Sequence, residues 1–194
     1  MAFSGKNHAL LLLLLLPAVL IPYQASCDSH QSTINSLYEP KYVHLTFYQH
    51  ETLNKTAYLV TDGLLGTVDL VPFGTPFGSL VVFHDTFTAT EDPDSEVVGE
   101  GEGTFITSRF DGSAGITTCI FNLNLPNYKG TVSIVGATHV SVPSDHPIVG
   151  GTGDFLFAKG YAKSTLVSLE GLTVIYRADL HLYWPSYAAP KSSN

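Results

Sequence analysis

The chain has 194 residues, with 9 Lys and Arg against 17 Asp and Glu, a formal net charge of −8 and 44% hydrophobic residues. This length and apolar content fit one globular domain and exclude disorder for most of the chain. The 17 Gly, 11 Pro, 11 Phe and 10 Tyr favour a β-rich fold with tight turns over long helices. Because the chain is acidic and has no run of Lys or Arg, we expect no nucleic-acid partner.

Residues 1–27 have the pattern of a secretory signal peptide. Lys6 precedes an apolar stretch from Ala9 to Ile21, and small residues lie just before Cys27. The stretch contains Pro17 and is shorter than the roughly 20 apolar residues of a membrane anchor. We therefore expect a protein secreted to the extracellular space, with no membrane span. Residues 28–40 are polar and aperiodic, so we expect a flexible N-terminal segment there.

Short runs of β-branched and aromatic residues, separated by Gly, Pro, Asp and Asn, predict eight strands. No stretch has an apolar period of 3.6 residues, and the connections are too short for the crossovers that parallel strands need. The sequence therefore predicts an all-β fold, an eight-stranded antiparallel β-barrel over residues 41–185, with a sandwich as the second possibility. Residues 186–194 are expected to form a C-terminal tail. The expected strands are Tyr42–His50, Thr56–Thr61, Gly78–His84, Val97–Ser108, Ile116–Asn124, Thr131–Thr138, Gly153–Thr165 and Leu172–Trp184.

The last predicted strand has two different faces. Every second residue from Leu172 to Trp184 is apolar, whereas the residues between them include Arg177 and Asp179. The mixed face is solvated if it points outward, the ordinary arrangement for an antiparallel strand. If it points inward, its polar groups need partners inside a cavity. The sequence leaves both arrangements open and favours the solvated one.

Neither cysteine belongs to a disulfide framework, because Cys27 lies at the expected cleavage site and Cys119 lies within a strand. We expect Cys119 to be a buried apolar residue rather than a reactive thiol. The sequon Asn54-Lys55-Thr56 follows a strand. We therefore expect Asn54 to be glycosylated on a surface loop.

The sequence has no Gly-x-Ser-x-Gly, Gly-x-x-x-x-Gly-Lys or His-Glu-x-x-His signature, and its eight His do not fall at metal-ligand spacing. We therefore expect no metal and no cofactor, although a catalytic triad assembled across the fold stays open. Acids at strand ends are the remaining candidates, namely Glu51, Asp85, Asp145 and Asp154. Asp154 follows a glycine turn and is expected to stabilise it. Glu51 and Asp145 adjoin aromatic or apolar strands, where an apolar cavity would raise a carboxyl pKa toward neutrality and permit proton transfer.

Four segments resemble the successive signatures of plant dirigent proteins, in order and in spacing. With the intervening residues, the resemblance extends from Tyr42 to Tyr183. It implies an eight-stranded antiparallel barrel of the dirigent, allene-oxide-cyclase-like type, a homotrimer, secretion to the apoplast and a pocket for a small phenolic substrate. The segments are Leu45–Glu51, Asn54–Thr56, Phe77–Asp85 and Val149–Phe155.

The resemblance implies one of two reactions that involve a quinone methide. A dirigent protein of the first kind is not itself an oxidant and guides the coupling of coniferyl alcohol radicals, which an oxidase such as a laccase makes. One of the second kind, typified by pterocarpan synthase, dehydrates a hydroxyisoflavanol, and a neighbouring phenol then closes a ring. Both reactions need a pocket acid, a pocket base and a shape that fixes the face of attack.

The chain departs from the lignan-forming dirigent proteins at pocket positions that the resemblance identifies. Those proteins carry His-Asp in place of His50-Glu51, an Asp in place of Thr138 and Arg-Asp in place of Ser144-Asp145. They also bridge an N-terminal cysteine to one near the C-terminus, where this chain has none. The resemblance therefore favours the isoflavanol dehydratase branch. The segments similar to that branch are Thr46–Thr56, Pro143–Phe155 and His181–Pro185.

We predict that Glu51 and Asp145 form an acid–base pair at the mouth of the pocket. Three hypotheses remain: an isoflavanol dehydratase, a non-catalytic guide for radical coupling, and a carbohydrate-binding or cell-wall-binding barrel. Conversion of a hydroxyisoflavanol without an oxidase would separate the first hypothesis from the second. The substrate-binding residues that the resemblance implies are Phe47, Gln49, Phe83, His84, Thr138, Phe155 and Arg177.

Overall fold

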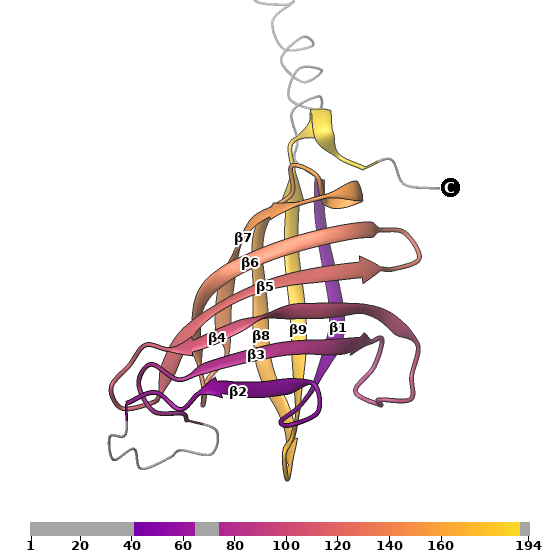
Figure 1. Ribbon diagram of the computed structural model, residues 1–194. Helices are drawn as coiled ribbons and strands as arrows, with labels where there is room; N and C mark the ends of the chain where they lie inside the picture. Colours follow the sequence, from indigo (N-terminus) through magenta and orange to yellow (C-terminus); the bar gives the residue numbers. More distant parts are fainter. Residues whose placement is uncertain (1–40, 65–73, 191–194) are drawn as a thin grey trace, which may run out of the picture. The chain divides into compact units, whose positions relative to one another are not determined.

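Eight strands form a closed antiparallel barrel in the computed structural model, which describes residues 41–64 and 74–190 (Figure 1). Pairing of the first strand with the third closes the ring, so the predicted eight-stranded barrel is confirmed. The expected signal peptide (1–27) and N-terminal segment (28–40) lie outside the described residues. In ring order the strands are β1 (Lys41–Thr52), β9 (Thr173–Trp184), β8 (Lys159–Glu170), β7 (Ser144–Gly151), β6 (Lys129–His139), β5 (Ala114–Asn124), β4 (Val97–Thr107) and β3 (Leu80–Thr88).

The membership of the ring differs from the sequence prediction in two strands. β2 (Ala57–Thr61) is a predicted strand, but it pairs with β3 alone among the described strands and lies outside the ring. β7 is absent from the predicted strands because Pro147 and the pair Gly150-Gly151 are typical of turns. β7 nevertheless pairs with β6 and β8 and supplies the eighth strand of the barrel.

The alternation of side chains decides which residues reach the barrel interior. Along β5, Thr117, Cys119, Phe121 and Leu123 are buried, and the residues between them are exposed. On β9 the apolar face is buried inside the barrel, whereas Arg177 on the mixed face is exposed. The mixed face therefore points outward, where Arg177 is exposed and Asp179, only 6% exposed, accepts hydrogen bonds from Thr46 and Arg177.

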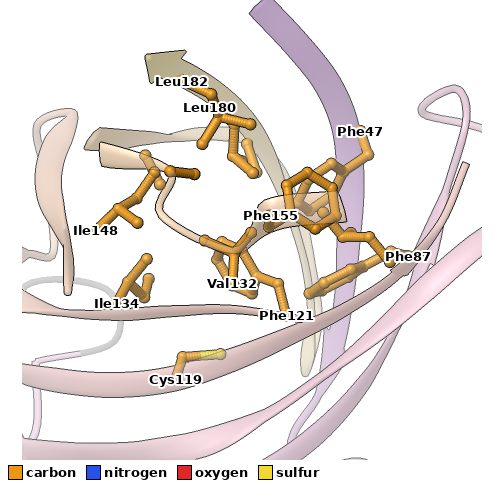
Figure 2. Close-up of a cluster of buried hydrophobic side chains, with 14 of the residues drawn as sticks. Phe47, Phe87, Cys119, Phe121, Val132, Ile134, Ile148, Phe155, Leu180 and Leu182 are labelled. Atoms are coloured by element: carbon orange, nitrogen blue, oxygen red, sulfur yellow. The ribbon is translucent and has the colours of Figure 1, made fainter. Parts of the chain in front are cut away.

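One half of the barrel interior is filled with apolar side chains, which Figure 2 shows converging from several strands. The rings of Phe47 and Phe87 stack at 4.6 Å, and each meets the edge of Phe121 within 5.5 Å. Phe155 is fully buried in the same cluster, 6.4 Å from the ring of Trp184. This packing closes the end of the barrel where β1 begins and β9 ends.

Phe155 reaches the cluster from a short 3-10 turn, η1 (Gly153–Phe155), between β7 and β8. Oδ2 of Asp154 accepts a hydrogen bond of 2.8 Å from the backbone N–H of Lys129, at the start of β6. Asp154 therefore stabilises this turn, as the glycine-rich sequence before it predicts. A second turn, η2 (Ser186–Ala188), follows β9. Within the described ranges, no helix is long and apolar enough to cross a membrane.

Two glycines of β4 make room for aromatic rings inside the barrel. A Cβ at Gly101 would collide with the ring of Phe87, and a Cβ at Gly103 would collide with the ring of Phe83 and with the backbone of β5. Phe83 can therefore lie flat against β4 and leave the space beside it open.

Candidate active site in the barrel cavity

The other half of the barrel interior is a cavity of about 390 Å³, at the end where β1 ends and β9 begins. Most of its lining side chains are apolar or aromatic, which suits a small aromatic guest. Its polar side chains belong mainly to two groups, one on β1 and β9 and the other on β5, β6 and β7. The lining residues are Gln49, Glu51, Leu53, Gly74, Thr75, Val81, Phe83, Phe105, Thr117, Cys119, Phe121, Ile134, Thr138, His139, Val140, His146, Ala162, Lys163, Ser164, Leu166, Leu172, Val174, Tyr176 and Ala178.

Glu51 supplies a carboxyl group to the first wall. It follows Gln49 by two residues on β1, so both side chains face the interior. Burial, with a smaller contribution from the charge of Asp85, raises the pKa of Glu51 from 4.5 to about 7. The carboxyl therefore keeps its proton at weakly acidic pH and can donate that proton to a guest.

A second carboxyl, that of Asp85 on β3, lies behind this wall. Asp85 is 1% exposed, and the Nε2 amide of Gln49 donates a hydrogen bond of 2.7 Å to its Oδ2. Its Oδ1 has no hydrogen-bond partner among the described residues. Burial raises the pKa of Asp85 to about 6, against the opposing effect of its hydrogen bonds. Because Asp85 does not line the cavity, it acts on a guest only through Gln49 and Glu51.

Tyr176 lies on the same wall and keeps its proton. Burial raises the pKa of its hydroxyl, and the charges of Glu51 and Asp85 raise it further. The hydroxyl is therefore a hydrogen-bond donor rather than a base. Cys119 is 2% exposed and free, and burial raises the pKa of its thiol, so the expectation of a buried and unreactive cysteine is confirmed.

The second wall carries a chain of hydrogen-bonded side chains. The Oγ1 atoms of Thr117 and Thr138 are 2.6 Å apart, and Oγ1 of Thr138 is 2.8 Å from Nε2 of His146. Burial lowers the pKa of His146, so its imidazole is neutral at neutral pH. A neutral imidazole has one acceptor nitrogen, which can receive a proton.

Six of the nine predicted site residues lie inside the barrel, either in the cavity or in the apolar cluster beside it. Phe47 and Phe155 are fully buried in the cluster and do not line the cavity. Their rings instead close the barrel at the inner end of the cavity. The predicted site residues that do line the cavity are Gln49, Glu51, Phe83 and Thr138.

His84 and Arg177, both expected to bind substrate, lie on the outer surface of the barrel. Nε2 of His84 is 3.2 Å from Oε2 of Glu100, and a guanidinium nitrogen of Arg177 is 3.0 Å from Oδ2 of Asp179. Both side chains are exposed and neither lines the cavity. They point outward because the adjoining residues on their strands point inward.

Asp145 is also exposed on the outer surface, so the expected pair of Asp145 with Glu51 does not form. The next residue, His146, is buried and lines the cavity. The carboxyl that influences Glu51 is Asp85 instead. Asp145 is misplaced because the side of the sheet on which a side chain lies is known only once the strand and its register are known. β7 is the strand that the sequence pattern does not predict.

Two residues of the site are therefore additions to the predicted candidates, namely His146 and Tyr176, whereas Asp85 is a candidate acid to which the sequence assigns no role. Alternation from Phe83 would assign Asp85 to the interior, and alternation along β9 would do the same for Tyr176. No comparable signal identifies His146, because its strand is not predicted. Among the described residues, no three or more His, Cys, Asp or Glu are arranged to hold a metal ion.

Known sequences resemble this chain over the whole barrel. The family described as Dirigent-like protein matches residues 42–183. Dirigent protein 23 of Arabidopsis thaliana is 32% identical over 166 residues, which cover 81% of this chain and 87% of the relative. Pterocarpan synthase 1 of Glycyrrhiza echinata is 30% identical over 174 residues, which cover 86% of this chain and 90% of the relative.

A solved structure also has this fold. The pterocarpan synthase dirigent protein GePTS1 superimposes with a TM-score of 0.67 at 24% identity, over 79% of this chain and 96% of that chain. The range matched by the family runs from the start of β1 to the end of β9, so it contains both walls of the cavity. The chain therefore belongs to the dirigent protein family.

Proposed function

We propose that this dirigent protein is an isoflavanol dehydratase, which removes water from a hydroxyisoflavanol and allows a phenol to close the ring of a pterocarpan. The proposal depends on one observation, the Glu51 carboxyl, which keeps a proton near neutral pH in a mainly apolar cavity. A carboxylic acid in such surroundings is suited to protonating a hydroxyl group that leaves as water.

The reaction begins with the benzylic hydroxyl of the guest next to Glu51. Transfer of the Glu51 proton to that oxygen breaks the C–O bond, and water leaves as the phenol of the same ring loses its proton. The product is a neutral quinone methide. A second phenol oxygen attacks the benzylic carbon and restores the aromatic ring, while the cavity wall fixes the face of attack.

The relatives support the family chemistry without separating its two reactions. Identity to the pterocarpan synthase is 30% and identity to Dirigent protein 23 is 32%, so sequence identity alone does not favour either reaction. The alternative is a non-catalytic guide that holds phenoxy radicals, such as those of coniferyl alcohol, made by an oxidase or laccase. Only the dehydratase needs no oxidant, so conversion of its substrate with no oxidase present distinguishes the two functions.

The test is conversion of a hydroxyisoflavanol by the purified protein with no oxidase present, followed by chromatography and mass spectrometry of the pterocarpan. We expect turnover by the wild type and a loss of about 10²–10⁴-fold in kcat for Glu51→Gln. Glu102→Gln is a matched control, because Glu102 is exposed on the outer face of β4. Failure of the wild type to convert the substrate, with stereoselective coupling once laccase and coniferyl alcohol are supplied, would replace this function with the alternative.

We also propose that the mature protein is a secreted homotrimer, glycosylated at Asn54. The leader pattern of residues 1–27 supports secretion. Asn54 is exposed in the turn between β1 and β2, where an oligosaccharide has room. Glycosidase treatment of the plant-made protein should increase its gel mobility, and light scattering of the purified protein should give three times the protomer mass.

A further inference from the structure

The hydrogen-bonded chain of the second wall has no part in the acid step described above. Its central residue, Thr138, lies on β6, which is four strands from β1 in either direction around the ring. Thr138 therefore lies across the barrel from Glu51, and both side chains line the same cavity. A guest that fills the cavity can contact Glu51 with one end and Thr138 with the other.

Thr138 is the most accessible of the three hydrogen-bonded side chains. Its side chain is partly exposed, whereas Thr117 is 9% exposed and His146 is 3% exposed. Nε2 of His146 contacts Thr138, and Nδ1 is buried with no hydrogen-bond partner among the described residues. A hydroxyl group of the guest at this wall therefore meets Thr138, the most exposed of the three residues, and Thr138 connects it to the imidazole by a hydrogen bond.

Other titratable groups surround His146 on each neighbouring strand. Asp145 adjoins His146 on β7, and His139 lies at the end of β6. Lys163 lies on β8, next to Ala162, the residue that pairs with His146. Asp145 and His139 have opposite and smaller effects on the imidazole than burial has. The neutral state of His146 is therefore set mainly by the apolar wall.

We infer that Thr138 is a catalytic residue that contacts the phenolic hydroxyl of the guest, and that His146 is a positioning residue that takes the phenolic proton through Thr138. The inference rests on the proposed dehydration and adds the base that this reaction needs. Loss of the phenolic proton pushes electrons through the ring and expels the benzylic oxygen that Glu51 protonates.

The proton transfers balance over the complete reaction. In the first half, the phenol gives its proton to Oγ1 of Thr138 as the Thr138 proton moves to Nε2 of His146, and Glu51 gives its proton to the departing water. In the second half, the attacking phenol gives its proton to the Glu51 carboxylate. The proton on His146 returns through Thr138 to the oxygen of the former quinone methide. One water is lost, and both protein groups regain their starting states.

Two other ionisable groups near Glu51 are less suited to this transfer. Tyr176 holds its own proton more tightly than an ordinary tyrosine, since burial raises its pKa. Asp85 does not line the cavity, and it lies on β3, which adjoins β1 in the ring. The chain formed by Thr138 and His146 is therefore the proton acceptor that faces Glu51.

The first experiment measures the ionisation of a bound phenol and does not require turnover. 4-Nitrophenol is titrated with protein at neutral pH, and the absorbance of its phenolate is recorded for the wild type, Thr138→Val and His146→Gln. We expect each substitution to lower the ionised fraction of the bound probe by about twofold or more, because each removes the proton acceptor. Thr118→Val, on the exposed face of β5, and Glu51→Gln should not lower it.

Equal ionised fractions in the wild type, Thr138→Val and His146→Gln would overturn the inference, and so would failure of the probe to bind saturably. Turnover gives a second measurement on the same variants. We expect Thr138→Val and His146→Gln to lower kcat by about 10²-fold or more while the Kd of the pterocarpan product stays within about threefold. Unchanged kcat in both variants would also overturn it. If the wild type converts no hydroxyisoflavanol, the proposed function fails. The 4-nitrophenol result still decides whether Thr138 and His146 accept a phenolic proton.

Discussion

Replacing Glu51 with Gln should stabilise the protein at alkaline pH, although it removes the proposed proton donor. In the unfolded chain this carboxyl titrates near its ordinary pKa of 4.5, whereas burial raises the pKa to about 7 in the folded protein. As the pH rises through this window, the unfolded state loses its proton first, so the wild type becomes less stable. Below about pH 4.5 the carboxyl is protonated in both states, and the wild type keeps its full free energy of unfolding. Gln has no titrating proton, so the variant escapes this loss.

The magnitude follows from the size of the pKa shift, from 4.5 to about 7. One pKa unit corresponds to about 1.36 kcal/mol, so the free energy of unfolding of the wild type falls by about 3 kcal/mol across the window. In a domain of this size, each kcal/mol changes Tm by about 2–4 °C. We therefore expect Glu51→Gln to melt about 6–12 °C above the wild type at about pH 8, and close to the wild type at about pH 4.5.

The assay is thermal denaturation of the wild type and the variant, followed by circular dichroism at both pH values. Glu102→Gln serves as the control, since the exposed Glu102 should give the same Tm difference from the wild type at each pH. A Glu51→Gln difference that does not change between the two pH values would refute the reasoning, because it would mean that the Glu51 carboxyl titrates alike in the folded and unfolded states.

Three further predictions concern other residues of the barrel. Asp145→Asn should change kcat by less than about twofold in the hydroxyisoflavanol assay, because an exposed carboxyl outside the cavity has no contact with the guest. Asp85→Asn removes a charge that raises the pKa of Glu51, so the loss of activity at alkaline pH should begin at a lower pH in the pH–rate profile. Phe155→Ala should lower the free energy of unfolding by about 3–5 kcal/mol in urea denaturation, since it empties a fully buried site.

The fold is predictable from the sequence because turn residues and β-branched runs are local signals. These signals give the barrel and the number of strands in the ring, but they misassign one member. Pro147 has no backbone N–H to donate, and Gly150 and Gly151 have weak strand propensity. Only pairing with β6 and β8, the strands before and after it in the sequence, makes this segment a strand.

The candidate site is less predictable, because a side chain's face depends on register as well as on residue type. Gln49 and Glu51, which the family resemblance identifies, line the cavity, because their two-residue spacing places both on the inner face of β1. Asp145 and His146 differ by one position, and this single step decides between the solvent and the cavity. The family resemblance points to the carboxyl of Asp145, whereas the pairing of β7 with its neighbours places the imidazole of His146 in the interior.

Burial in this cavity has opposite effects on its acid and its base. The same apolar cavity raises the pKa of Glu51 and lowers the pKa of His146, because desolvation disfavours a negative carboxylate and a positive imidazolium alike. Near neutral pH, Glu51 is therefore substantially protonated and His146 is neutral. A neutral phenolic guest can enter without desolvating a fixed charge on either group. Charge on these two groups then develops only as protons move during the reaction, and each reset returns Glu51 and His146 to their uncharged states.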